Sequence, residues 1–91
     1  MHFDDHLIGF LKASKYRQKI LQMLTKSNFT TPSDLAKELN ITLPQVSRTL
    51  SELERAKLVM CTTPNRSKGR IYRITSKGSN LFSNMGENYV A

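Results

Sequence analysis

Apolar residues recur every three or four positions in two neighbouring segments between residues 31 and 57, which is the spacing of one face of an α-helix. The first segment places Leu35, Ala36 and Leu39 on one face. The second segment does the same with Leu43, Val46, Leu50 and Leu53. Both segments are therefore predicted to be helices whose apolar faces pack into a core.

The residues at the ends of these segments favour two helices joined by a tight turn. Thr31 is a candidate N-cap, and Pro32 suits the first position of a helix. Asn40 tolerates the left-handed backbone that commonly ends a helix. Thr42 and Gln45 have the Thr-x-x-Gln spacing of a capping box. The pattern is typical of a helix-turn-helix, although an ordinary pair of antiparallel helices with a solvated outer face would resemble it.

The outer face of the second helix is polar to basic. At 100° per residue, the side chains opposite the apolar face are Pro44, Arg48, Ser51 and Arg55, with Gln45 and Ser47 on the flanks. Hydroxyl, amide and guanidinium groups on one helical face suit the base edges and phosphates of duplex DNA.

The flanking segments predict an α+β fold that is mainly helical. Helical spacing over residues 14–26 is kept by Tyr16, Ile20, Met23 and Leu24. The β-prone segments 58–62 and 70–75 enclose a turn-rich tip at 63–69, which predicts a two-stranded hairpin. Phe29 is a candidate for a third strand.

The two ends of the chain are less regular. Residues 1–13 are expected to form either an irregular arm or a short helix. A final helix is expected over 76–86 and should end at Gly86.

Three cations, Lys15, Arg17 and Lys19, lie in the first turn of the helix predicted over 14–26, where they oppose the helix dipole. One explanation is that the helix begins earlier, with Asp4 and Asp5 at its start. A second is an outside partner such as phosphate, and a third is a solvated basic face.

Composition limits the class of protein. The chain has 91 residues, which is expected to be one domain (1–91), and its 38% hydrophobic content argues against disorder. A net charge of +7 attracts polyanions, and no apolar run approaches the roughly 20 residues that would span a bilayer. A lone cysteine, Cys61, and an acidic N-terminus without a signal peptide favour a cytoplasmic protein with no membrane partner.

The positive charge is concentrated in one part of the chain. Residues 56–86 contain no acid, and their cations are Lys57, Arg66, Lys68, Arg70, Arg73 and Lys77. A cationic hairpin beside a polar helix predicts one element for the major groove of DNA and a second for the phosphate backbone.

The order of these elements resembles the winged helix-turn-helix regulators: a three-helix core, a β-wing of two or three strands and a C-terminal helix. LPQVSRTLSELERAKLV (43–59) resembles the recognition helix and first wing strand of the MarR-like and ArsR-like families. NRSKGRIYRITSKG (65–78) resembles the MarR-like wing, and SKYRQKIL (14–21) the first helix of small archaeal-type members. Lys57 departs from the glycine that these families often have before the first wing strand.

The resemblance implies a sequence-specific double-stranded DNA-binding transcriptional regulator. The recognition helix, 42–57, would face the major groove through Thr42, Pro44, Gln45, Ser47, Arg48 and Ser51. The basic wing, 63–70, would reach the backbone or minor groove through Arg66, Lys68 and Arg70. At the start of the first motif helix, Thr31 and Ser33 would contact a phosphate. A winged helix that binds another protein, in transcription or nucleic-acid machinery, is the alternative.

A homodimer is expected because the family reads DNA with two-fold symmetry. The apolar ends of the chain are the predicted interface: Phe3, Leu7, Ile8, Phe10 and Leu11, with Leu81, Phe82, Met85 and Tyr89. No catalytic residues or metal site are predicted, because His2 and His6 lie near the terminus without an acid–base pair around them. No cofactor or small-molecule effector is predicted either.

Overall fold

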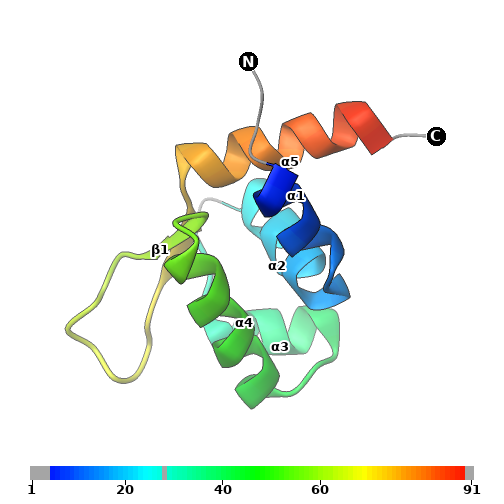
Figure 1. The fold of residues 1–91 in the computed structure, drawn as a ribbon. Coiled ribbons are helices and arrows are strands. Elements are labelled where there is room, and N and C mark those ends of the chain that lie inside the picture. Colours follow the sequence, from blue (N-terminus) through cyan, green and yellow to red (C-terminus); the bar gives the residue numbers. More distant parts are fainter. Residues whose placement is uncertain (1–4, 28, 90–91) are drawn as a thin grey trace.

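The computed structural model describes the backbone of residues 5–27 and 29–89 and the side chains of residues 6–27 and 29–84. Its elements, in chain order, are α1 (Asp5–Lys12), α2 (Lys15–Lys26), α3 (Pro32–Leu39), α4 (Leu43–Arg55), β1 (Val59–Cys61), β2 (Tyr72–Ile74) and α5 (Ser76–Tyr89). The mainly helical α+β class is confirmed, and part of the N-terminal segment is a helix (Figure 1).

The helix predicted over 14–26 does not begin earlier. The Ser14 hydroxyl caps α2 by accepting a hydrogen bond from the Arg17 N–H at 3.3 Å, and Asp5 begins the separate helix α1. Asp4 lies outside the described residues. Arg17 has its partners inside the protein: its Nε donates to Glu52 of α4 at 3.1 Å and its Nη1 to the Phe10 carbonyl of α1 at 2.8 Å. An outside phosphate is therefore not needed to explain why Arg17 is tolerated in the first turn of α2.

The predicted ends of α3 and α4 are confirmed with one difference. The Thr31 and Thr42 hydroxyls accept hydrogen bonds from the N–H groups of Asp34 and Gln45, at 3.1 and 3.3 Å. Asn40 is left-handed with φ 54°, so the chain turns sharply between the helices. The capping box is only half formed, because the Gln45 amide donates to Thr49 instead of returning to Thr42.

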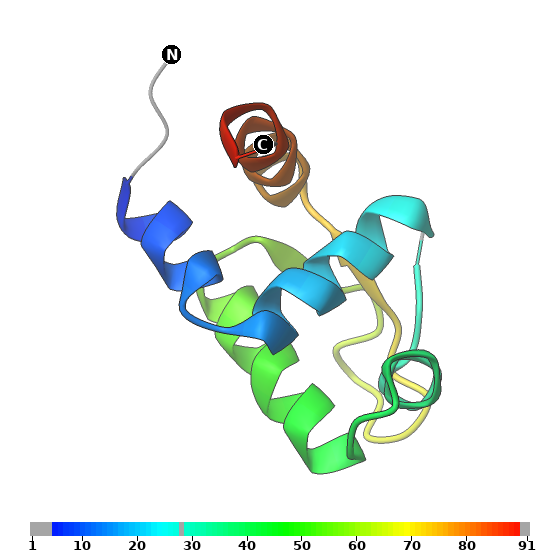
Figure 2. The same ribbon diagram turned by 90° about the vertical axis from the view of Figure 1, so that its right-hand side faces the viewer.

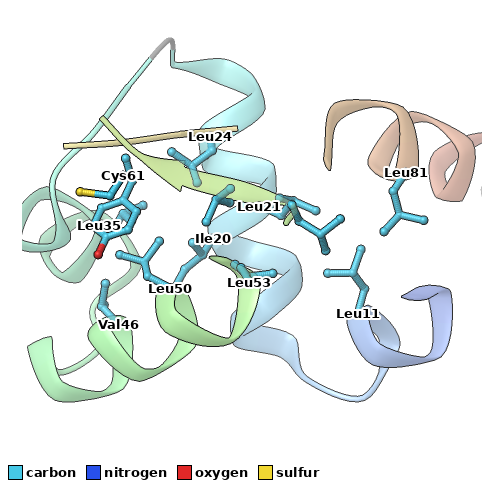
Figure 3. Close-up of a cluster of buried hydrophobic side chains, with 13 residues drawn as sticks. Leu11, Ile20, Leu21, Leu24, Leu35, Val46, Leu50, Leu53, Cys61 and Leu81 are labelled. Carbon is cyan, nitrogen blue, oxygen red and sulfur yellow. The ribbon is translucent and has the colours of Figure 1, made fainter. Parts of the chain in front are cut away.

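The core lies where α1, α2, α3, α4, the wing strands and α5 meet (Figure 3). Among the described side chains, those almost wholly shielded from solvent are Leu11, Ile20, Leu21, Leu24, Leu35, Val46, Thr49, Leu50, Leu53, Leu58, Val59 and Leu81. The spacing predicts Leu43 on this face as well, but Leu43 is 45% exposed. Val46, Leu50 and Leu53 fill the core face of α4, and Leu43 lies a turn earlier, beyond the edge of the core.

The hairpin is antiparallel, with Val59 opposite Ile74 and Cys61 opposite Tyr72. A third strand is reduced to one pair, in which Thr30 and Tyr72 exchange backbone hydrogen bonds of 2.9 and 2.8 Å. Phe29, the candidate third-strand residue, precedes this pair and is 63% exposed. The described strands are shorter than predicted, so more of the segment belongs to the loop at the wing tip.

The wing joins α5 through a compact connection. Lys57 is left-handed, with φ 65°, in the position where the family resemblance leads one to expect glycine. The Thr75 hydroxyl donates to the Lys57 carbonyl at 2.7 Å and accepts from the Gly78 N–H at 3.0 Å, so it ties the end of α4 to the start of α5. The prediction that Gly86 ends α5 is wrong, because the helix continues to Tyr89.

The molecule has two distinct ends. In Figure 1, α5 and the start of α1 lie at the top, whereas α3 and the start of α4 lie at the bottom with the wing loop beside them; Figure 2 shows the same division from the side. None of the described helices has the length and apolar character needed to cross a membrane.

Candidate nucleic-acid interface

A cleft of about 570 Å³ lies between the start of α3, the outer face of α4 and the wing. Its lining residues are Thr31, Pro32, Ser33, Leu43, Ser47, Ser51, Ser67, Lys68, Gly69, Arg70 and Tyr72. Three segments that are separated in sequence therefore form one concave surface, and α3 and the start of α4 lie at the end of the molecule away from α5 (Figure 1).

The helix α4 supplies one wall of this cleft. Leu43, Ser47 and Ser51 are four residues apart, so they form one exposed stripe along the helix. Arg48 and Pro44 are also exposed, on the neighbouring stripe. Within the described part of the chain, Ser47, Arg48 and Ser51 make no side-chain hydrogen bond or ion pair, so their polar groups are available to a ligand.

The start of α3 supplies a second wall. Thr31 is the N-cap, and Ser33 is exposed in the first turn, where unpaired backbone N–H groups and the helix dipole favour an anion. Asp34 is in the same turn but does not line the cleft. The residues that do line it are neutral, which leaves this wall open to phosphate.

The wing supplies the third wall and the charge. Arg66 and Lys68 are exposed in the loop, and neither forms an ion pair within the described residues. Lys68 lines the cleft, whereas Arg66 lies outside it. Not every cation of the acid-free segment belongs to this surface, because the Lys77 amine donates to the Ala56 carbonyl at the end of α4.

Arg70 is held at the base of the wing. Its Nε donates to the Cys61 Sγ at 3.4 Å, and its guanidinium lies 5.9 Å from the centre of the Tyr72 ring. Burial raises the pKa of the Cys61 thiol, but the hydrogen bond from Arg70 and those involving Thr63 outweigh it, so the net pKa is lowered. Burial also raises the pKa of Tyr72, although the Arg70 charge opposes this effect. Arg70 thus lines the cleft while contacting Cys61 and Tyr72 on the two wing strands.

The structure brings together part of the predicted site. Six predicted residues line the cleft: Thr31, Ser33, Ser47, Ser51, Lys68 and Arg70. The remaining five, which lie outside it, are Thr42, Pro44, Gln45, Arg48 and Arg66. Of these, Gln45 is half-buried and bonded to Thr49, whereas the other four are exposed.

Sequence reasoning did not name five of the lining residues as site residues: Pro32, Leu43, Ser67, Gly69 and Tyr72. Helical spacing places Leu43 on the core face, because its angle is only about 60° from that of Val46. Tyr72 reaches the cleft because its strand pairs with Thr30, next to the start of α3. The strand pattern predicted a wing strand here but did not indicate which neighbouring element Tyr72 would meet.

Residues 13–62 match the sequence profile of a protein family described as "Helix-turn-helix domain". The chain belongs to this helix-turn-helix domain family. One of its relatives is the HTH-type transcriptional regulator FarR of Neisseria gonorrhoeae, which is 31% identical over 70 residues. The match covers 76% of this chain and 48% of FarR, so the helix-turn-helix chain spans about half the length of that relative.

Solved structures define the fold of the helix-turn-helix chain more closely. A MarR family transcription regulator superposes with a TM-score of 0.73 at 24% identity, over 82% of this chain and 50% of that protein. A mutant MarR from E. coli, solved with operator DNA, superposes with a TM-score of 0.72 at 23% identity, over 81% of this chain and 54% of that protein. The fold is therefore the winged helix-turn-helix fold of MarR-family regulators, as the sequence resemblance predicted.

Proposed function

We propose that this protein is a transcriptional regulator that binds double-stranded DNA, with α4 in the major groove and the wing on the backbone or in the minor groove. The main support for the proposal is the cleft, which is lined by the polar stripe of α4, the start of α3 and the wing cation Lys68, which forms no ion pair within the described residues. Support also comes from the FarR relative, named as a transcriptional regulator, and from the MarR neighbour solved with operator DNA.

Each wall of the cleft has a separate task in this proposal. The hydroxyls of Ser47 and Ser51 and the guanidinium of Arg48 meet base edges, and Arg48 can pair with guanine through two hydrogen bonds. Thr31 and Ser33 meet a phosphate at the start of α3. Lys68 and Arg66 meet phosphates along the wing.

The proposed regulator is a homodimer. A single recognition helix contacts only a few base pairs, which is too little to distinguish one site among many. A two-fold axis would place two copies of α4 about 34 Å apart, on successive turns of the major groove. No described residue of α1 or α5 lines the cleft, and α5 lies at the end of the molecule away from α3 and the start of α4 (Figure 1), so pairing through α1 and α5 would leave both clefts free.

The wing provides the test of DNA binding. In the double variant Arg66→Ala, Lys68→Ala, affinity for specific and non-specific duplex should fall together, because both cations are expected to contact phosphate. The slope of log K against log salt concentration should flatten by roughly 1 for each phosphate that the wing no longer neutralises. Fluorescence anisotropy titrations between low and moderate salt measure both quantities.

The matched control is Lys19→Ala, Lys26→Ala, which removes the same charge from exposed positions of α2 outside the cleft. This variant should keep the wild-type salt slope. An equal change in both variants would assign the effect to net charge alone and reject the wing contact. Failure of the wild-type chain to bind duplex DNA at low salt would overturn the proposed function and favour a protein-binding winged helix.

A further inference from the structure

We propose that Leu43 reads the C5 methyl group of a thymine in the bound DNA. The inference rests on the proposed function and adds to it the chemical identity of one recognised base. Its starting point is an apolar side chain that the fold leaves 45% exposed inside a cleft otherwise rich in hydroxyl and cationic groups.

The position of Leu43 in α4 favours contact with bases. Leu43 is the first residue of the helix, and recognition helices of this architecture contact base edges with their N-terminal residues. The Thr42 hydroxyl caps the helix directly before it, so the backbone at this position is held in place. Leu43 also continues the stripe of Ser47 and Ser51, so one helical face would present an apolar group followed by two hydroxyls.

Leu43 is not one of the residues through which α4 packs against the core. The buried side of α4 is occupied by Val46, Thr49, Leu50 and Leu53. The other large hydrophobic residues that are exposed among the described side chains are Tyr16, Phe29 and Met60, and none of them lines the cleft. Among the described large hydrophobic side chains that are exposed, Leu43 is therefore the one that lines the proposed DNA surface.

The chemistry of the major groove narrows the partner. An apolar side chain cannot pair with the donors and acceptors of the base edges, and the apolar group that unmodified DNA presents there is the C5 methyl of thymine. Contact with Leu43 would remove both apolar surfaces from water, which is favourable. Cytosine, guanine or adenine at the same position would leave Leu43 against polar atoms.

Uracil provides the test, because it differs from thymine only in lacking the methyl group and keeps the same hydrogen-bonding edge. The full chain is first used to select bound sequences from random duplexes. Each thymine of the selected site is then replaced by uracil, and affinities are measured for the wild type, Leu43→Ala and Met60→Ala. Met60 is the matched control, since it is 42% exposed but lies on the wing strand β1, outside the cleft.

For the wild type and Met60→Ala, uracil at one position per α4 should weaken binding about fourfold, the effect of removing one methyl group from an apolar contact. Leu43→Ala should bind the thymine site more weakly and respond to uracil at that position by less than about twofold. Far-ultraviolet circular dichroism verifies that Leu43→Ala is folded.

Two results would overturn the assignment. Indifference of the wild type to uracil at every position would show that no methyl group is read. Full sensitivity to uracil in Leu43→Ala would assign the contact to another side chain, such as the neighbouring Pro44. Both results leave DNA binding itself intact. The absence of any selected duplex would instead reject the proposed function together with this inference.

Discussion

At the scale of single residues, Gly78 sets how closely α5 can approach the end of α4. A Cβ atom at this position would clash with the Leu58 carbonyl oxygen, which is backbone and cannot move aside. Gly78→Ala should therefore lower the free energy of unfolding by about 1–3 kcal/mol or more, measured by urea denaturation. Gly9→Ala is the control, because nothing lies within 4 Å of its Cβ position in α1.

The stability of the control variant should change in the opposite direction. Alanine is favoured over glycine inside a helix, so Gly9→Ala should raise the free energy of unfolding by about 0.5–1 kcal/mol. A loss of stability in Gly9→Ala equal to that in Gly78→Ala would contradict the steric explanation.

A second residue-scale prediction concerns the pH dependence of stability. Burial raises the pKa of Tyr72 above its ordinary value of 10.0, although the Arg70 charge opposes this shift. The neutral phenol is thus favoured in the folded state. Its contribution to the free energy of unfolding is fully present below pH 10 and is lost as the pH rises through the folded pKa of Tyr72. Relative to Tyr72→Phe, the wild type should lose this extra stability above about pH 10, by at most about 1.4 kcal/mol per pH unit.

The measurement compares urea unfolding of the two proteins at about pH 8 and at several values above about pH 10. Other tyrosines and lysines titrate in both proteins, so the informative quantity is the difference between the two curves. Curves that remain parallel through this range would show that the environment of Tyr72 does not favour its neutral form.

At the scale of elements, Arg17 joins three helices. It donates to the Phe10 carbonyl of α1 and to Glu52 of α4 from its place in α2, and its guanidinium lies 4.1 Å from the centre of the Phe10 ring. Arg17→Met keeps the apolar stem but removes the guanidinium that makes these interactions, and should cost about 1–2 kcal/mol. Glu52→Gln removes only the partly exposed ion pair and should cost less than about 1 kcal/mol.

Hydrogen exchange then locates the effect, because the amides of α1 should lose more protection in Arg17→Met than in Glu52→Gln. Lys19→Met, at an exposed position of the same helix, should change stability by no more than about 0.5 kcal/mol. Equal costs for all three variants would mean that Arg17 does not hold α1 in place.

At the scale of the whole molecule, the structure changes which residues can form the proposed dimer interface. Leu11 and Leu81, both predicted there, are fully buried in the core, and Figure 3 shows them facing each other. Leu7, Ile8, Phe10 and Phe82 are packed against the core without being fully buried, and they remain candidates. Phe3 lies outside the described residues, as do the side chains of Met85 and Tyr89.

The dimer prediction is tested by sedimentation equilibrium at micromolar concentration. The wild type should show twice the 10.4 kDa mass of one chain, and Ile8→Glu should shift it towards that mass and lower affinity for the selected DNA. Met60→Glu, on the wing, should remain a dimer. A wild-type species of 10.4 kDa, both free and on DNA, would reject the dimer.

Much of this protein could be predicted from sequence where the physics is local. Thr31, Thr42 and Asn40 act within one helical turn, so side-chain chemistry at those positions marks the helix ends. The β-prone residues around Val59 and Cys61 and the turn-rich tip likewise predicted the hairpin. The polar stripe of α4 and the acid-free wing predicted two walls of the candidate site, because both depend on residue type and helical or strand spacing.

Tertiary structure decided what depends on which elements meet. Leu43 lies near the core face by angle, but α4 extends past the core, so the residue faces the cleft. Arg17 is unfavourable at the start of α2 by local electrostatics, yet Glu52, 35 residues away, and the Phe10 carbonyl supply its partners. Periodicity specifies the face that a side chain occupies, whereas only packing specifies how far the core extends along that face and which distant group lies opposite.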